Sequence, residues 1–254
     1  MAREHPLRDL GLAVSLLTLV PTPARWPDDG RTQVAAWFPA VGAVLGAAGY
    51  AVVKLAETFG VLDRAPLVVA AIVVALWAGV TRLLHWDGLA DVADGWWGAH
   101  EPARRLEIMS DSRTGAFGAT TVALVAILEV AAIAAIAPAH QSLVLLVPLF
   151  ARCAATAAAW LGQPARPDGL GRSVMGSPTP LAAIITAGTI APALALLWTG
   201  LALPGVVLGV LALTVALGVP HLLAGRFGGV TGDVMGASVL LTETVLFVVV
   251  ALVA

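Results

Sequence analysis

The sequence contains few charged residues and a single cysteine. Charged side chains make up 12% of its 254 residues, about half of the roughly 25% found in soluble globular domains. The single Cys153 excludes a disulfide within the chain, and the net charge of −2 gives no indication of a nucleic-acid partner. Hydrophobic residues make up 59% of the chain and its mean hydropathy is +0.92. This composition is typical of a polytopic membrane protein.

Seven apolar segments approach the length of about 20 residues that a helix needs to cross a bilayer. They cover residues 38–56, 65–84, 116–137, 142–161, 181–200, 203–224 and 237–254. The apolar run 10–20 is too short to cross, and it predicts an interfacial or re-entrant helix. We therefore predict an all-α, polytopic helical membrane protein with about seven transmembrane helices. Residues 1–254 would form a single integral membrane catalytic domain with an acidic cytoplasmic helix or loop.

The positions of the cationic residues predict the orientation. If the N-terminus is cytoplasmic, eleven of the fourteen Lys and Arg residues fall on that side, among them Arg3 and Arg31. Only Lys54 and Arg64 fall on the other side, and Arg152 lies inside a span. The positive-inside rule then places the N-terminus and the polar loops 82–115, 162–180 and 225–236 in the cytoplasm. We expect a multi-pass protein of a bacterial cytoplasmic (inner) membrane with its active-site loops on one face.

Three aspartates form the strongest candidate site. Asp87, Asp91 and Asp94 stand at i, i+4 and i+7, so on an α-helix they fall within roughly 60° of one another. Stacked carboxylates repel one another, and a hard cation with oxygen ligands such as Mg²⁺ would offset that repulsion. A solvated helix face is the alternative, but the residues between the aspartates are small or apolar. The array indicates a metal or phosphate site.

Residues close to this array extend the candidate site. Asp111-Ser-Arg-Thr-Gly follows it; Asp111 is a further candidate ligand, and Arg113 offers a guanidinium for phosphate oxygens. Asp111 or Ser112 could equally cap the following helix. His85 could ligate metal, act as a base or lie at the membrane interface.

The remaining polar segments supply candidates with plausible structural alternatives. Arg104 and Arg105 could bind a polyphosphate or anionic headgroups, although an ordinary surface helix is slightly favoured. The glycine-rich loops 166–177 and 228–237 could cradle phosphate or form plain turns. Asp233, at an expected helix start, is a candidate second-loop metal ligand. Candidate phosphate-binding groups are Arg104, Arg105, Ser112, Gly229, Thr231 and Gly232.

Three ionisable residues lie within predicted spans, where they need partners or a wet cavity. Glu129 and Arg152 fall at similar depths on consecutive spans, which predicts an ion pair between them. Glu243 lies about one and a half turns from the cytoplasmic face. We expect it to lie behind Asp233, with Asp233 itself close to Asp91.

The motifs together resemble the cobalamin synthase family, the adenosylcobinamide-GDP ribazoletransferases. The resemblance extends over nearly the whole chain and is most specific in two motifs at their spacing, His85-Trp-Asp-Gly-Leu-Ala-Asp-Val-Ala-Asp-Gly and Asp111-Ser-Arg-Thr-Gly-Ala-Phe-Gly. Leu17-Thr-Leu-Val-Pro-Thr-Pro, Trp37-Phe-Pro-Ala-Val-Gly and Gly229-Val-Thr-Gly-Asp-Val-Met-Gly-Ala add to it. The loop containing Arg166 and Arg172 matches more loosely.

The resemblance implies a Mg²⁺-dependent phosphotransferase. Its substrates would be adenosylcobinamide-GDP and α-ribazole or its 5′-phosphate, and its products adenosylcobalamin or its 5′-phosphate and GMP. The implied catalytic residues are His85, Asp87, Asp91, Asp94 and Arg113, and the implied metal ligands are Asp87, Asp91, Asp94, Asp111 and Asp233. Association with other cobalamin-assembly enzymes and a homo-oligomer both stay open.

Three other classes of protein fit the sequence less well. A CDP-alcohol phosphotransferase also uses an acidic helix at the membrane face, but its D-G-x-x-A-R start fails because Asp91 stands where Arg is required. A divalent-cation transporter would need carboxylates at the bilayer midplane on several helices. A membrane scaffold without enzymatic activity leaves the aspartate array unexplained.

Overall fold

The computed structural model describes residues 5–27 and 32–253, and within these ranges it is helical apart from loops and one isolated bridge between Pro164 and Val230. The predicted all-α membrane architecture is confirmed. Arg3, Arg31 and Ala254, which entered the predicted topology and the last predicted span, lie outside the described residues.

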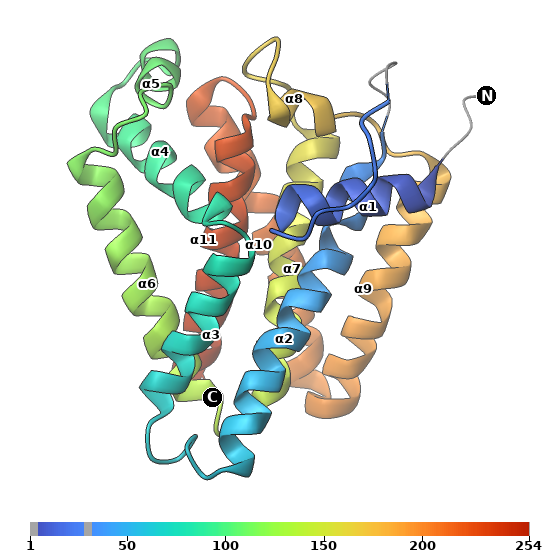
Figure 1. Cartoon of the computed structure of the whole chain (residues 1–254), viewed down its shortest axis with the longest axis vertical. Coiled ribbons are helices and arrows are strands. Elements are labelled where there is room, and N and C mark those ends of the chain that lie inside the picture. Colours follow the sequence, from blue (N-terminus) through green and yellow to red (C-terminus); the bar gives the residue numbers. More distant parts are fainter. Residues whose placement is uncertain (1–4, 28–31, 254) are drawn as a thin grey trace.

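The chain forms eleven α-helices and one 3₁₀ helix within the described residues (Figure 1). They are α1 (Pro6–Leu17), η1 (Val34–Trp37), α2 (Phe38–Thr58), α3 (Pro66–Val80), α4 (Leu84–Gly98), α5 (Pro102–Ile108), α6 (Ala116–Ile136), α7 (Gln141–Leu161), α8 (Leu170–Val174), α9 (Pro180–Leu201), α10 (Leu203–Phe227) and α11 (Gly232–Val253).

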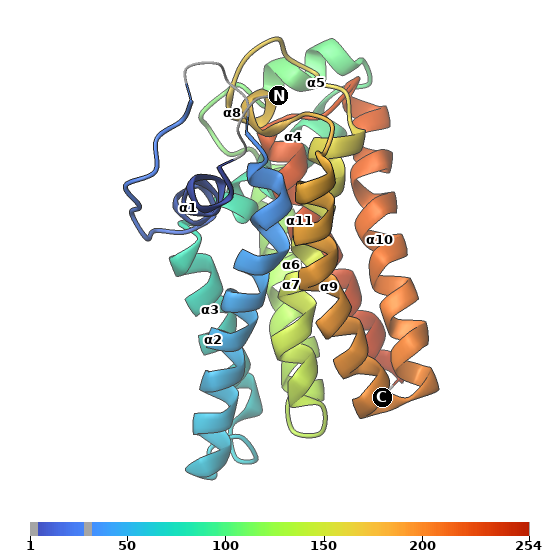
Figure 2. The same ribbon diagram turned by 90° about the vertical axis from the view of Figure 1, so that its right-hand side faces the viewer.

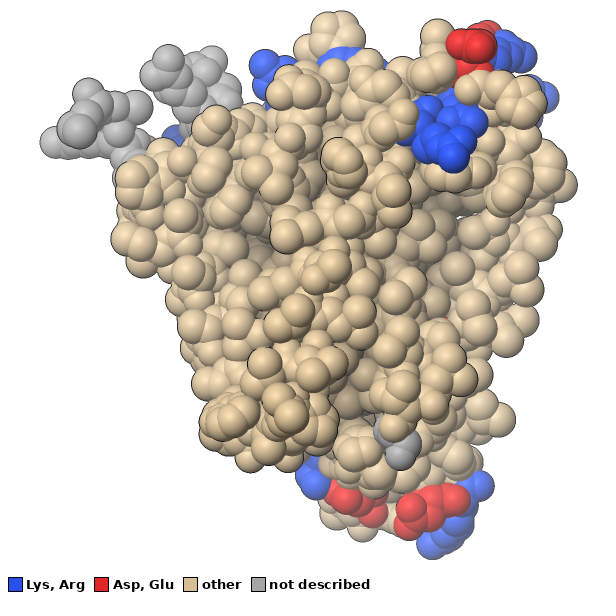
Figure 3. Space-filling model, turned by 180° about the vertical axis from the view of Figure 1, so that it is seen from behind, with Lys and Arg blue, Asp and Glu red and all other residues tan. Residues whose placement is uncertain are grey.

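Six of the described helical segments are long and apolar enough to cross a membrane, namely η1 continued by α2, α6, α7, α9, α10 and α11. They agree with six of the predicted spans to within a few residues. The largest difference is in α11, which begins at Gly232 and so includes Asp233 in its first turn. The space-filling view shows acidic and basic side chains gathered at the two ends, with a broad belt free of them between (Figure 3). This distribution suits a bilayer around the middle of the bundle.

The predicted span 65–84 differs from the structure. Helix α3 ends at Val80 and has 15 residues, which is about 22 Å of helix and shorter than the hydrocarbon core of about 30 Å. Arg82 and Leu83 then adopt positive φ angles of 53° and 58°, and α4 leaves at an angle of 89° to α3. Counted as one broken crossing, the pair gives the seven crossings predicted. The break turns the acidic helix α4 away from the axis of α3 and toward the polar end.

Helix α7 is the centre of the bundle and is buried along most of its length (Figures 1 and 2). Helices α2, α10 and α11 pack on it, and α4 in turn lies between α11 and α6. Helix α1 lies across the other helices near the end that carries α5 and α8 (Figure 1). The run 10–20 therefore does not cross the bundle, in agreement with the prediction.

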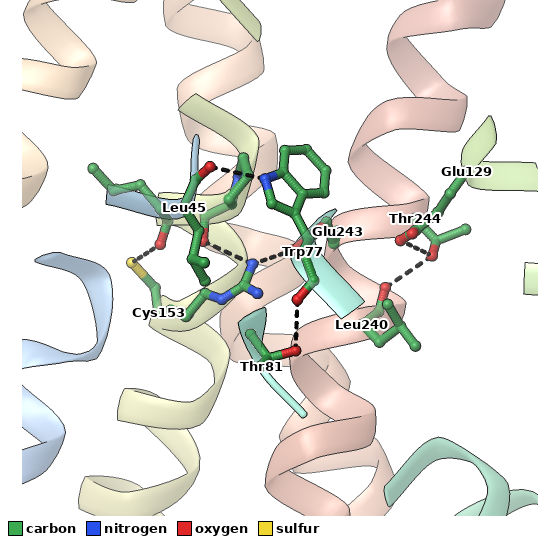
Figure 4. A network of polar contacts seen from close by, with 11 residues as sticks. Leu45, Trp77, Thr81, Glu129, Cys153, Leu240, Glu243 and Thr244 are labelled. Carbon is green, nitrogen blue, oxygen red and sulfur yellow. Dashed lines mark hydrogen bonds and ion pairs between the residues drawn. The ribbon is translucent and has the colours of Figure 1, made fainter. Parts of the chain in front are cut away.

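A network of polar side chains is buried inside the bundle (Figure 4). The predicted ion pair between Glu129 and Arg152 does not form; Arg152 of α7 pairs with Glu243 of α11. Glu129 instead accepts a hydrogen bond of 2.8 Å from the Thr244 hydroxyl. The reason lies in the packing, because α7 lies against α11 along its length and contacts α6 much less.

Candidate functional site

A cavity of about 270 Å³ opens at the polar end of the bundle. Its wall combines residues of α4, of the loop that contains α8 and of the start of α11, so the three predicted polar loops do lie at one end of the molecule (Figure 1). Its polar lining residues are His85, Asp87, Arg166, Asp168, Arg172, Thr231 and Asp233. Carboxylates and guanidinium groups thus face one space.

Backbone contacts join the second and third polar loops. Ala165 N donates to Val230 O at 3.0 Å, and Val230 N donates to Gln163 O at 2.8 Å. Gly229 between them has a φ of 147°, and a Cβ there would lie 2.7 Å from Ala165 N. Its own N–H donates to Ala224 O at 2.9 Å. The structure therefore places the Gly229 amide in a loop-to-loop connection, and it is not part of the cavity lining.

Thr231, Gly232 and Asp233 reach the cavity at the start of α11. The Thr231 hydroxyl accepts a hydrogen bond of 3.2 Å from Val234 N and donates one of 3.3 Å to Asp233 Oδ2. A threonine that accepts from the amide three residues later satisfies one of the free N–H groups at a helix start. The contacts fix the first turn of α11 and hold the Asp233 carboxylate at the wall.

The three aspartates of α4 have different surroundings. Asp87 is exposed and lines the cavity. Asp91, one turn further, is partly buried, and burial is the main cause that raises its pKa from 3.8 to about 7. The negative charge of Asp233 is the next cause, followed by those of Asp87 and Asp94, while Arg166 acts in the opposite direction. The predicted proximity of Asp233 to the α4 aspartates is confirmed, since Gly88 of α4 lies against the Asp233 backbone and the charge of Asp233 acts on Asp91.

Asp94 is buried and turned toward α6. Its Oδ2 accepts from Gly115 N at 2.7 Å and its Oδ1 accepts from Gly118 N at 2.8 Å. Both oxygens therefore accept hydrogen bonds from amides at the start of α6, where the helix dipole favours a carboxylate. Asp94 does not line the cavity, and the structure gives it an anchoring contact between α4 and α6.

Asp111 and Arg113 lie on the surface and bind each other. Arg113 Nη2 donates to Asp111 Oδ2 at 2.7 Å and Arg113 Nε donates to Asp111 Oδ1 at 3.0 Å. These hydrogen bonds lower the pKa of Asp111 to about 2. The Arg113 side chain is 87% exposed, and neither residue lines the cavity. Ser112 between them is exposed as well.

The two consecutive arginines of α5 have opposite positions. Arg104 is exposed and pairs with Glu107 at 2.6 Å. Arg105 is 5% exposed and donates to the backbone oxygens of Ala99 at 2.9 Å and Arg226 at 2.8 Å. Its guanidinium also lies 5.7 Å from the ring centre of Trp96. Arg105 therefore joins α5 to α10 and does not face the cavity, in contrast to the phosphate-binding position predicted for it.

Two arginines outside the predicted site set belong to the cavity. Arg166 Nη2 donates to Leu106 O at 2.8 Å and to Ser110 Oγ at 3.1 Å, which holds its charge beside Asp91 and Asp233. Arg172, on α8, is exposed and lines the cavity. The signal in the sequence was the arginine and glycine content of this loop. Ordinary turns have the same content, so the sequence alone did not distinguish a binding site from a connecting loop.

His85 forms part of the inner wall. It is 4% exposed, and its Nε2 has no hydrogen-bond partner within the described chain. Burial, together with the charge of Arg152, lowers the pKa of His85 well below 6.5. A second, much smaller cavity lies on its other side, lined by Glu129, Arg152 and Glu243 among others. His85 therefore separates the site from the buried network, and Glu243 lies behind His85, paired with Arg152.

Mg²⁺ suits the donor chemistry of the site. Asp87 and Asp233 line the cavity and Asp91 lies beside its lining; all three offer carboxylate oxygens, which this cation prefers. The charges of Asp233, Asp87 and Asp94 add to the effect of burial in raising the pKa of Asp91. In the part of the chain that the structure describes, no three His, Cys, Asp or Glu side chains already stand in a ligating arrangement. Binding a cation would thus require side-chain rearrangement.

The chain is similar to proteins of one family over nearly its whole length. The family model for cobalamin-5-phosphate synthase matches residues 9–251. The chain is 39% identical over 255 residues to the adenosylcobinamide-GDP ribazoletransferase of Bradyrhizobium diazoefficiens, covering 98% of this chain and 95% of that protein. It is 40% identical over 236 residues to the protein of the same name from Syntrophobacter fumaroxidans, covering 89% and 91%. No solved structure matches the chain.

Proposed function

Because the chain belongs to the cobalamin-5-phosphate synthase family, as its acidic motifs predicted, we propose that it is an adenosylcobinamide-GDP ribazoletransferase. A hydroxyl of α-ribazole, or of its 5′-phosphate, attacks the cobinamide-side phosphorus of adenosylcobinamide-GDP. The new oxygen–phosphorus bond forms as the bond to the bridging oxygen breaks. GMP leaves with that oxygen, adenosylcobalamin or its 5′-phosphate remains, and a base of the site takes the hydroxyl proton.

The observation that carries this proposal is the meeting of opposite charges in one cavity. Asp87 and Asp233 face the same space as Arg166 and Arg172. Phosphoryl transfer is catalysed chiefly by positioning and by neutralising the charge on the phosphoryl oxygens and the leaving group. Arginine binds phosphate oxygens through a planar fork of donors. We assign the diphosphate to Arg166 and Arg172, in place of the exposed Arg113.

Mg²⁺ is part of the proposal. Asp87, Asp91 and Asp233 are the residues that would hold it, and when bound it would supply positive charge to the diphosphate. Asp94 and Asp111 are less suited to this role, because their oxygens are engaged by the start of α6 and by Arg113.

The carboxylates are better candidates for the proton acceptor than His85. A base works best with a pKa near the working pH, and the lowered pKa of His85 leaves it neutral and weakly basic. Its Nε2 is also buried away from solvent. We propose that His85 shapes the inner wall and that Asp87 or Asp233, both facing the cavity, accepts the proton.

An assay with the purified full-length protein in nanodiscs tests the function. With Mg²⁺, adenosylcobinamide-GDP and α-ribazole, we expect GMP and a corrinoid product in equal amounts by chromatography. Asp87→Asn should lower the rate by orders of magnitude. Asp63→Asn is the matched control and should not: Asp63 belongs to the connection between α2 and α3, and this connection lies at the opposite end of the bundle (Figure 1). Release of GMP without α-ribazole at an equal rate would identify a hydrolase and reject the proposal.

We further propose that the cavity faces the cytoplasm of a bacterial inner membrane. The cation distribution supports this orientation. In a Cys153→Ala background, Ser112→Cys should be protected from an impermeant thiol reagent in intact cells, whereas Asp63→Cys should react. Reaction of Ser112→Cys from outside would reverse the orientation.

The two enzymatic and transport alternatives have less support. The family match covers residues 9–251, which a CDP-alcohol phosphotransferase would not explain. A cation transporter would need ligands along the bundle axis, but Glu243 is paired with Arg152 and Glu129 is bonded to Thr244.

A further inference from the structure

The wall of the cavity has two chemically different parts. Its charged residues come from the loops and helix starts at the polar end, as described above. Its other wall residues are apolar, and they include Leu17 of α1, Phe38 of α2, Ala155 of α7 and Val239 of α11. All four of these side chains are at most 5% exposed. The cavity is therefore a charged mouth that continues into an apolar slot.

The slot points from the mouth toward the membrane interior. Val239 follows Asp233 by six residues on α11, which places it about 9 Å further along the helix axis. Ala155 likewise precedes the polar end of α7, at Leu161, by six residues. His85 is also part of this wall. A ligand that fills the cavity would thus have a polar group at the loops and an apolar group within the bundle.

The size of the cavity selects between the two substrates of the proposed function. Its volume of about 270 Å³ is slightly below the range for small-molecule sites, roughly 300–1,000 Å³. A corrin macrocycle carrying a nucleotide is far larger than such a space. Ribazole is small, with a flat bicyclic aromatic base and a hydroxylated ribose. Its apolar and polar halves correspond to the slot and the mouth.

We propose that the apolar slot binds the aromatic base of the nucleoside acceptor. This inference rests on the proposed function. The ribose lies at the mouth, where Asp87 and Asp233 can receive its hydroxyls, and adenosylcobinamide-GDP stays on the loop side with its diphosphate near Arg166 and Arg172. Burial of the base in an apolar wall stabilises the complex, and a charged acceptor base would be excluded by desolvation.

Helix α1 forms part of the slot wall as well as lying across the other helices. Leu16 and Leu17, at its end, line the cavity. The helix is held against the bundle by the Arg82 guanidinium, which donates to Ser15 O at 3.3 Å, and by Asp9 Oδ2, which accepts from Gln33 N at 3.0 Å. The amphipathic helix therefore closes one side of the slot.

Steady-state kinetics with slot variants test the assignment. Val239→Phe fills the slot, and we expect the KM for α-ribazole to rise at least about tenfold, as for one or more misfitted methylenes in an apolar pocket. The KM for adenosylcobinamide-GDP should change less than about twofold. Val250→Phe is the matched control, because Val250 is a buried valine of the same helix outside both cavities, and neither KM should change.

A second variant and a binding measurement cover the remaining outcomes. If Val239→Phe does not fold, Val239→Ala enlarges the slot and should raise the KM for α-ribazole, on the order of tenfold. A rise confined to adenosylcobinamide-GDP, or no change in either KM, would overturn the proposal; the second result is expected if the slot holds a lipid chain. If the wild type makes no product, the proposed function fails. Equilibrium dialysis of labelled α-ribazole against wild type and Val239→Phe then decides the slot assignment alone.

Discussion

Gly88 of α4 lies directly against the backbone of Asp233 of α11. A Cβ at position 88 would stand 2.8 Å from Asp233 O and 3.1 Å from Asp233 Cα, closer than packed atoms allow. The absence of a side chain at one residue thus lets the acidic helix approach the start of α11. This contact brings the carboxylates of Asp87, Asp91 and Asp233 into one group although about 140 residues separate them in the chain.

Gly88→Ala should therefore impair the site. The obstructing atoms are backbone and cannot rotate away, so α4 and α11 must separate. We expect the turnover to fall at least about tenfold, as displacements of around 1 Å can cause, together with a lower Tm. Gly79→Ala is the control, since a Cβ there meets nothing within 4 Å. Unchanged turnover in Gly88→Ala would show that the α4–α11 contact does not position the site.

Asp87→Asn and Asp94→Asn should have different effects. Asp87 faces the cavity, so its amide variant should lose turnover and keep the wild-type Tm. Asp94 accepts from Gly115 N and Gly118 N, and an amide can accept through only one of its two groups. We expect Asp94→Asn to lower the free energy of unfolding by about 1 kcal/mol, as for a lost helix cap. Thermal unfolding and kinetics on both variants check this; equal losses of turnover at unchanged Tm would contradict it.

The raised pKa of Asp91 predicts a dependence of stability on pH. The group holds its proton more tightly in the folded state, with a pKa of about 7 against 3.8. Its contribution to stability is therefore complete below pH 3.8 and is lost as the pH rises through about 7. Without divalent cations, the Tm should fall between pH 5 and pH 8, and Asp91→Asn should flatten this dependence.

Mg²⁺ supplies a further check on the same group. A cation binds the ionised carboxylate, so Mg²⁺ should raise the Tm more at pH 8 than at pH 5. Asp111→Asn serves as the control: its pKa of about 2 arises from hydrogen bonds to Arg113, and its removal should leave the Mg²⁺ effect intact. An equal Mg²⁺ effect in Asp91→Asn and wild type would argue against Asp91 as a ligand.

Arg104 and Arg105 form a natural matched pair. Arg105→Lys removes the forked hydrogen bonds to Ala99 O and Arg226 O and the stacking on Trp96, so the Tm should fall, by the equivalent of about 2 kcal/mol. The KM for both substrates should stay unchanged. Arg104→Lys keeps an exposed charge and should alter neither quantity. A rise in KM for adenosylcobinamide-GDP in Arg105→Lys alone would restore its predicted phosphate contact.

Much of this architecture could be predicted because it depends on simple, periodic requirements. A bilayer demands apolar runs of a fixed length, and six spans were located to within a few residues. The cation bias placed the three polar loops together, and the location of Asp233 beside the α4 aspartates followed from that. The break after Val80 was missed because Thr81, Arg82 and Leu83 carry no glycine or proline to mark it.

The remaining differences concern which neighbours a side chain meets. Depth along two helices placed Glu129 and Arg152 at the same level, but only packing decides that α7 contacts α11, and thus that Arg152 meets Glu243. Arg104 and Arg105 are adjacent in the chain and about 100° apart on a helix, so the choice between solvent and interior depends on α10, which arrives more than a hundred residues later. The loop that contains Arg166 and Arg172 was a phosphate-binding candidate, but its glycines and arginines also suit ordinary turns, so the sequence did not single out these two residues.

A double variant should measure how much the Arg152–Glu243 pair contributes to the free energy of unfolding. Both side chains are only 3% exposed, so removing one partner leaves an unpaired charge inside the bundle. Arg152→Met and Glu243→Leu should each lower the free energy of unfolding by about 3–5 kcal/mol. The double variant should recover most of that loss, since neither member of the pair is left without its partner. Thr244→Val removes the hydrogen bonds that the Thr244 hydroxyl donates to Glu129 and to Leu240 O, and should cost about 1 kcal/mol. Thermal unfolding in nanodiscs gives the comparison.

Turnover of the double variant separates two roles: near wild-type turnover means that the pair only stabilises the bundle. Loss of turnover at a recovered Tm means that the pair acts on the site through His85, which lies between the two cavities. A double variant as unstable as either single one would contradict the ion-pair account.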